Sequence, residues 1–189
     1  MELLIKKCIY SCVKWLMLLI SLSAGFSAAA SENMPDNFYR VTPELYRSAQ
    51  PDRLQMQSLD RIGIRSVLNL RQWHSDADEA QGTGLILYRV PMNAAAINDD
   101  DVVIALSFLH RAAKPALVHC WHGSDRTGMI VALYQLLFSH ATKSEVLSEL
   151  RRPEYGYLQQ FYPDIARYIA AINVEELRER VLSLSAGKL

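Results

Sequence analysis

One stretch in the middle of the chain restricts its possible folds more than any other. Residues 115–119 form a short apolar run, typical of a strand buried in a parallel sheet, and residues 127–138 repeat apolar side chains at helical spacing. Only a short loop joins the two, with five residues between Cys120 and Arg126. A strand that passes so abruptly into a helix indicates an α/β fold with a mainly parallel sheet.

This loop has the composition of an anion-binding site. So tight a turn leaves backbone N–H groups unpartnered at a helix N-terminus, where they bind a dianion such as phosphate. Cys120 lies at the mouth of this nest, which together with Arg126 would stabilise a thiolate nucleophile. The planar fork of Arg126 can hold two phosphate oxygens, and Thr127 is close enough in sequence to hydrogen-bond the sulfur. The alternative, a buried core thiol and a surface arginine, does not explain this spacing.

The sequence His119-Cys120-x5-Arg126-Thr127-Gly128 resembles the signature of the cysteine-dependent protein tyrosine and dual-specificity phosphatases. Residues 45–51 and 64–71 resemble the first two strands of the small atypical dual-specificity phosphatases of plants, fungi and bacteria, and the likeness runs from about residue 38 to at least 138. The resemblance implies a tyrosine-phosphatase-like fold, a central mainly parallel sheet flanked by helices. It also implies hydrolysis through a phosphocysteine without a cofactor.

We predict that the whole loop binds the substrate. Its members are Trp121, His122, Gly123, Ser124, Asp125, Arg126 and Thr127. Trp121 and His122 are expected to select the substrate, the alternative being a solvent-exposed loop edge. His119 is expected to support the loop rather than act as a base. By family position Arg47 and Arg71 border the pocket, although either side chain can instead form a surface ion pair.

The general acid is the least determined residue. Dual-specificity phosphatases place an aspartate after the strand that corresponds to residues 85–92, but Asn93 and Ala94 stand there. Asp99 is one candidate, because residues 97–99 resemble an Ile-Pro-Asp segment of the atypical enzymes. Asp125 is the other, because an aspartate before the loop arginine also occurs in the myotubularin and Sac phosphoinositide phosphatases. Each also has a structural alternative, Asp99 as a helix-start acid and Asp125 as a hydrogen-bonding loop residue.

The first thirty residues have the order of a secretory signal peptide. Three lysines precede an apolar stretch, and residues 28–30 are alanines suited to cleavage after Ala30. A retained membrane anchor is the alternative. We therefore expect a signal peptide over 1–30, a phosphatase domain over 31–189 and a periplasmic or secreted product. That product keeps a single cysteine, so it cannot form an internal disulfide.

Apolar patterning predicts the order strand, helix, strand, loop, strand, helix, strand and then helices over 39–184. Helices are expected over 52–62, 99–113, 127–138, 143–151, 159–173 and 174–184, strands over 65–70 and 85–91, and a loop over 72–84. Outside the loop, the histidines His74, His110 and His140 are scattered, so no metal is expected.

Three functions fit these residues. The first is a secreted phosphatase of phosphotyrosine, with phosphoserine and phosphothreonine as further substrates, that acts as a monomer on a phosphorylated protein such as a membrane signalling protein. The second is a phosphatase of inositol phosphates, phosphoinositides or lipid phosphates. The third is a silent phosphate-binding or sulfur-transfer module, which the intact Cys120 and Arg126 disfavour. Residues 31–189 carry a net charge of −2, so no nucleic-acid partner is expected.

Overall fold

The computed structural model describes residues 33–187, and the predicted signal peptide lies outside this range. Five strands form one sheet in the order β1-β2-β5-β3-β4. Their bounds are Tyr39–Thr42 for β1, Leu45–Ser48 for β2, Ser66–Asn69 for β3, Ile86–Arg89 for β4 and Ala116–His119 for β5. Only β1 pairs antiparallel, with β2. The predicted mainly parallel sheet is confirmed.

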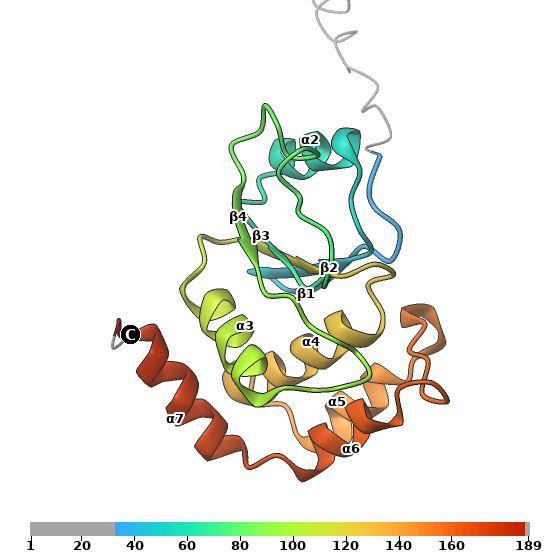
Figure 1. Ribbon diagram of the computed structural model, residues 1–189, viewed down its shortest axis with the longest axis vertical. Coiled ribbons are helices and arrows are strands. Elements are labelled where there is room, and N and C mark those ends of the chain that lie inside the picture. The colour runs from blue at the N-terminus through green and yellow to red at the C-terminus, as the bar shows by residue number, and fades with distance from the viewer. Residues whose placement is uncertain (1–32, 188–189) are drawn as a thin grey trace, which may run out of the picture. The chain divides into compact units, whose positions relative to one another are not determined.

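Helices cover both faces of this sheet, as Figure 1 shows. Helix α2 (Arg53–Arg61) lies on one face, and on the other lie α3 (Asp99–Arg111), α4 (Asp125–Phe138), α5 (Lys143–Leu150), α6 (Pro163–Ala171) and α7 (Val174–Ser185). A short 3-10 helix, η1, spans Pro153–Tyr155. No helix within residues 33–187 is long and apolar enough to cross a membrane.

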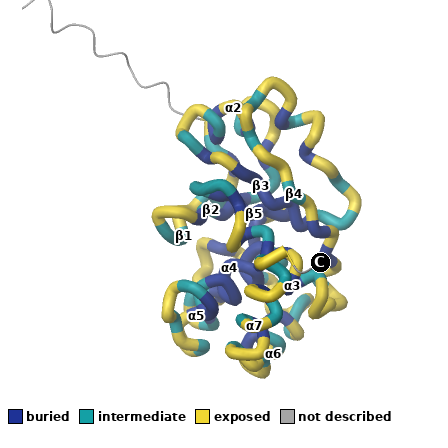
Figure 2. The backbone as a smooth tube through the Cα atoms, turned by 90° about the vertical axis from the view of Figure 1, so that its left-hand side faces the viewer, coloured by how far each residue is buried: buried dark blue, intermediate teal, exposed yellow. Residues whose placement is uncertain are grey.

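The alternation of side chains along the strands divides the core in two. Leu68 and Val118 belong to a large cluster with α3 and α4, whereas Val67 and Leu117 pack with Met56 of α2. The buried middle of the molecule in Figure 2 contains β3, β5 and α4. Burial on both sides holds the carboxyl end of β5 in place, where the phosphate-binding loop begins.

Two predicted helix bounds are corrected. Helix α4 begins at Asp125 rather than residue 127, so Asp125 and Arg126 lie in its first turn. Helix α6 begins only at Pro163, where the fixed backbone of proline suits the first helical position, and residues 159–162 lie before it. Helix α3 is capped by Asn98, whose side chain accepts hydrogen bonds from the N–H groups of Asp100 and Asp101.

Candidate active site

The predicted phosphate-binding loop runs from the end of β5 to the start of α4. Cys120 follows β5 directly and is a free cysteine with only 2% of its surface exposed. Ser124 is the N-cap of α4, although its side chain makes no capping hydrogen bond. The loop thus ends at a helix N-terminus, whose N–H groups and dipole favour an anion.

Gly123 and Arg47 fix the shape of this loop. Gly123 has a φ of +72°, and a Cβ there would lie 2.4 Å from the carbonyl oxygen of Ser48 at the end of β2. The Arg47 guanidinium donates a 2.7 Å hydrogen bond to the Gly123 carbonyl and lies 4.2 Å from the ring centre of Tyr155. Arg47 is 1% exposed, so it neither borders the pocket nor forms an ion pair at the surface. It supports the loop from the interior.

Several hydrogen-bond donors between Cys120 and the first turn of α4 have no acceptor. The Thr127 hydroxyl and the Arg126 Nε are buried without a partner among the described residues. Within the same range, no hydrogen bond is found for the backbone N–H groups of residues 121–124. Buried donors are almost always paired in folded proteins. A group of unpaired donors at a helix start therefore indicates that a bound anion completes the site.

Arg126 lines a solvent-open hollow. Its Nη1 donates to the carbonyl oxygens of Leu70 and Met92, at 3.3 and 3.2 Å, which ties it to the ends of β3 and β4. This Arg126 hollow has a volume of about 350 Å³. Half of its lining residues are aromatic or basic, and the lining consists of Arg71, Gln72, Trp73, Met92, Asn93, Ala94, Ala95, Trp121, Arg126 and Tyr162.

A buried histidine–aspartate pair lies beneath the loop. His119 Nε2 is 2.8 Å from Asp76 Oδ2, and His119 Nδ1 is 3.2 Å from the Cys120 carbonyl oxygen. Burial favours the neutral form of Asp76, but hydrogen bonds from His119 and Gln50 outweigh it and hold the pKa of this carboxyl below its ordinary value. The sequence predicted a supporting role for His119 but missed Asp76, which lies in the aperiodic loop after β3.

Neither predicted general acid lines the Arg126 hollow, and neither does Cys120; of the predicted catalytic and loop residues only Trp121 and Arg126 do. Asp99 accepts a 2.9 Å hydrogen bond from the Tyr168 hydroxyl, and its second oxygen lies 3.9 Å from Arg180. Asp125 is buried and accepts a 2.9 Å hydrogen bond from the Leu158 backbone N–H. Burial raises the pKa of Asp125 above its ordinary value. Both aspartates are thus held by contacts with the C-terminal part of the chain.

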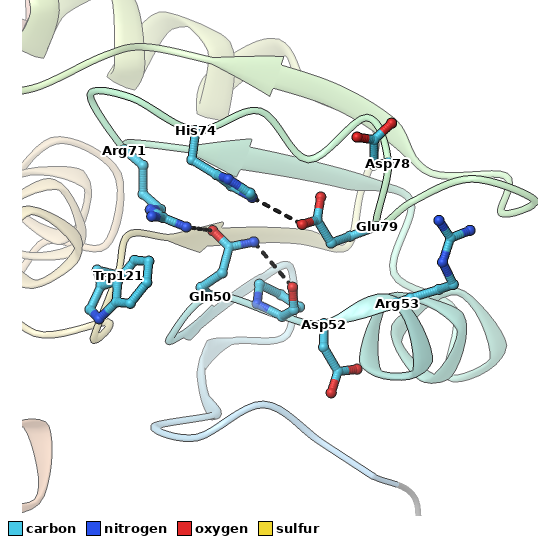
Figure 3. A pocket seen from close by; sticks show the side chains of 9 residues that line it. Gln50, Asp52, Arg53, Arg71, His74, Asp78, Glu79 and Trp121 are labelled. Atoms are coloured by element: carbon cyan, nitrogen blue, oxygen red, sulfur yellow. Dashed lines mark hydrogen bonds and ion pairs between the residues drawn. The ribbon is translucent and has the colours of Figure 1, made fainter.

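A second hollow adjoins the first and is drawn in Figure 3. The two share Arg71 and Trp121, whose guanidinium and ring centre are 4.0 Å apart. Arg71 also donates a 3.1 Å hydrogen bond to Gln50. Partial burial and the charge of Arg126 lower the pKa of Arg71, while Asp76 and Glu79 act in the opposite direction. Arg71 therefore does border the pocket, as its family position implied.

The histidines remain scattered, but the fold brings His74 near two carboxylates. Ligand atoms of His74, Asp76 and Glu79 lie within 4.8 Å of one another, with His74 Nε2 3.2 Å from Glu79. Asp76 already accepts hydrogen bonds from His119, Asn69 and Gln50. We explain the cluster as part of the network that surrounds the buried Asp76 charge.

Comparison with known proteins agrees with this geometry. Residues 34–183 match the sequence profile of the tyrosine phosphatase family. The dual specificity protein phosphatase TpbA of Pseudomonas aeruginosa is 30% identical over 149 residues, which are 75% of this chain and 65% of the relative. The match thus spans just under two thirds of that relative's length. The mouse dual specificity protein phosphatase 26 is 29% identical, over 64% of this chain and 63% of its own.

Solved structures show the same fold. A crystal structure of P. aeruginosa TpbA in complex with phosphotyrosine superimposes with a TM-score of 0.70 and 26% identity, and covers 85% of this chain and 98% of its own. The core catalytic domain of the PP-IP phosphatase SIW14 from S. cerevisiae, solved with citrate, gives a TM-score of 0.70 at 23% identity, over 83% of this chain and 96% of its own.

Proposed function

Because this chain belongs to the tyrosine phosphatase family, we propose that it hydrolyses phosphotyrosine through a phosphocysteine at Cys120. The observation that carries the proposal is the set of unpaired donors that follow Cys120 in the chain, formed by Thr127, Arg126 and the loop N–H groups. Such donors stabilise the charge on the equatorial oxygens of a phosphoryl group during transfer.

The reaction proceeds in two displacements. The Cys120 thiolate attacks phosphorus, the bond to the tyrosyl oxygen breaks, and the phenolate leaves and takes its proton from water. Water then attacks the phosphocysteine, the phosphorus–sulfur bond breaks, and the thiolate is regenerated as phosphate departs. Arg126 and the loop N–H groups hold the phosphoryl oxygens in both steps. The free Thr127 hydroxyl donates to the sulfur as it leaves in the second step.

The walls of the Arg126 hollow favour an aromatic phosphate. Trp73, Trp121 and Tyr162 line it, and Trp73 is 87% exposed, so a tyrosyl ring can pack against these side chains. Among the described residues, no carboxylate lines this hollow. A tyrosyl phenolate, with a pKa of about 10, leaves far more readily without an acid than a serine or threonine alkoxide. We therefore place phosphotyrosine above phosphoserine and phosphothreonine.

The proposed location and partner follow from the sequence. We propose that residues 1–30 direct export and that the exported domain acts as a monomer on a phosphorylated protein, such as a membrane signalling protein.

Matched phosphopeptides test the function. The domain over 31–189 should hydrolyse a phosphotyrosine peptide at least tenfold faster, in kcat/KM, than the same peptide with phosphoserine. Cys120→Ser should abolish turnover yet still bind the peptide, and Arg126→Lys should lower kcat/KM at least a hundredfold, because a point charge cannot reproduce the bidentate fork. Retention of more than about a hundredth of the activity in Cys120→Ser would contradict nucleophilic catalysis.

A further inference from the structure

The two adjoining hollows differ in the charge of their linings. The Arg126 hollow carries two guanidinium groups, Arg71 and Arg126, and no carboxylate among the described residues that line it. The second hollow, of about 610 Å³, carries three carboxylates, those of Asp52, Asp78 and Glu79, against two guanidinium groups, Arg53 and the shared Arg71. A hollow lined by guanidinium groups and no described carboxylate therefore lies, across one shared wall, beside one in which carboxylates outnumber guanidinium groups.

That shared wall consists of Trp121 and Arg71. The Arg71 guanidinium lies on the Trp121 ring and donates a hydrogen bond to Gln50, which lines only the second hollow, so its charge stays at the boundary between the two hollows. Trp121 is 53% exposed, which leaves indole surface free for a ligand that crosses from one hollow into the other. Figure 3 shows Arg71 and Trp121 together at one end of the second hollow, with Glu79 across from them.

Two of the three carboxylates of the second hollow have binding capacity left, whereas Asp52 accepts a hydrogen bond from the Gln55 N–H as the N-cap of α2. Glu79 Oε2 is buried without a hydrogen-bond partner, although Glu79 Oε1 lies 3.2 Å from His74. Asp78 is exposed and makes no ion pair within the described residues. Arg53, which with Arg71 lines the second hollow, donates a 3.4 Å hydrogen bond to the Gln81 side chain.

We propose that the second hollow is a subsite for a lysine or arginine that flanks the phosphotyrosine of a substrate peptide. The inference rests on the proposed function and names the substrate class for the same site. When the phosphate of such a peptide lies in the Arg126 hollow, its basic side chain can lie beyond Trp121, near the carboxylates of the second hollow. Each charge of the peptide then faces charges of the opposite sign. The same carboxylates repel a second phosphate, which disfavours inositol polyphosphates as substrates.

A charge series of peptides tests the subsite. The phosphotyrosine peptide carries lysine, alanine or glutamate at each position within three residues of the phosphotyrosine. At one or more of these positions we expect lysine to raise kcat/KM about threefold to tenfold over glutamate, as partly exposed ion pairs do. The preference should shrink at high salt, because screening weakens such pairs.

Variants locate the preference in the second hollow. Asp78→Asn and Glu79→Gln, and more so the pair together, should reduce the lysine-to-glutamate ratio toward one. Glu175→Gln on α7 removes an exposed carboxylate that lines neither hollow, and it should leave the ratio unchanged. Because the ratio is measured within each variant, a change in folded fraction does not alter it.

The outcomes separate the subsite from the proposed function. Hydrolysis of the alanine peptides with no lysine preference at any position would overturn the subsite and leave the phosphotyrosine assignment in place. A lysine preference unchanged in the Asp78→Asn, Glu79→Gln double variant would also overturn it, as would faster hydrolysis of inositol hexakisphosphate than of the lysine peptides. Failure to hydrolyse any phosphotyrosine peptide would overturn both.

Discussion

At the scale of single residues, Gly123 is the residue whose replacement should most directly distort the loop. A Cβ at this position would lie 2.4 Å from a backbone oxygen of the neighbouring strand, and backbone cannot move aside as a flexible side chain can. The positive φ adds strain for any other residue. Gly123→Ala should lower the free energy of unfolding by about 1–3 kcal/mol and kcat by more than tenfold, measured by urea unfolding and phosphotyrosine turnover. Gly82→Ala, where a Cβ meets nothing within 4 Å, serves as the control, and equal activity losses in both variants would contradict this role.

Asp76 is the second residue with a sharp expected effect. Its folded-state pKa lies below its ordinary value of 3.8. The hydrogen-bonded carboxylate therefore stabilises the fold above about pH 4, and this contribution is lost as the pH falls through the lowered pKa. Asp76→Asn should cost about 1.5–3 kcal/mol at neutral pH, the worth of hydrogen bonds to a charged group. Urea unfolding from pH 7 to pH 3 should show a shallower loss of stability in the variant than in the wild type. If the stabilities of the variant and the wild type fell in parallel between pH 7 and pH 3, the stabilising role of the Asp76 carboxylate would be contradicted.

At the scale of elements, the strand–loop–helix unit could be predicted from the sequence because its residues are consecutive. The apolar run of β5, the small residues of the loop and the helical spacing of α4 all lie within 115–138. The contacts of the acids could not be predicted in this way. Tyr168 is 69 residues from Asp99, and Leu158 is 33 residues from Asp125. Only the packing of the C-terminal segments against α3 and α4 reveals those partners.

The element-scale contacts give the two aspartates different expected roles. Asp125→Ala removes the acceptor that ties Leu158 to the start of α4, and should cost about 1–3 kcal/mol of stability. It should lower kcat/KM alike for phosphotyrosine and for p-nitrophenyl phosphate, whose phenolate leaves unaided. Asp99→Asn should leave both rates within about twofold of wild type. A loss of about a hundredfold confined to phosphotyrosine, in either variant, would instead identify that residue as the general acid.

At the scale of the whole molecule, the mainly parallel sheet flanked by helices follows from the alternation of apolar segments, although the strand order does not. Nor does the second hollow, because Gln50, Arg71, Glu79 and Trp121 come from three connections that only the folded sheet brings together. Asp76 was missed for the same reason, since its partner His119 lies 43 residues further along the chain.

The export proposal also belongs to the whole chain. Protein recovered from cells should begin near residue 31 and fractionate outside the cytoplasm, as N-terminal sequencing and fractionation can establish. An N-terminus at Met1 would contradict cleavage.

The most direct test of covalent phosphoryl transfer is to trap the intermediate. The domain over 31–189 is mixed with a phosphotyrosine peptide, quenched in acid within milliseconds, and digested for mass spectrometry. We expect one phosphoryl group on the peptide that contains Cys120, formed and lost at rates consistent with kcat, and none in Cys120→Ser. Full turnover without phosphocysteine, or with phosphate on another residue, would contradict the assignment of Cys120 as the nucleophile.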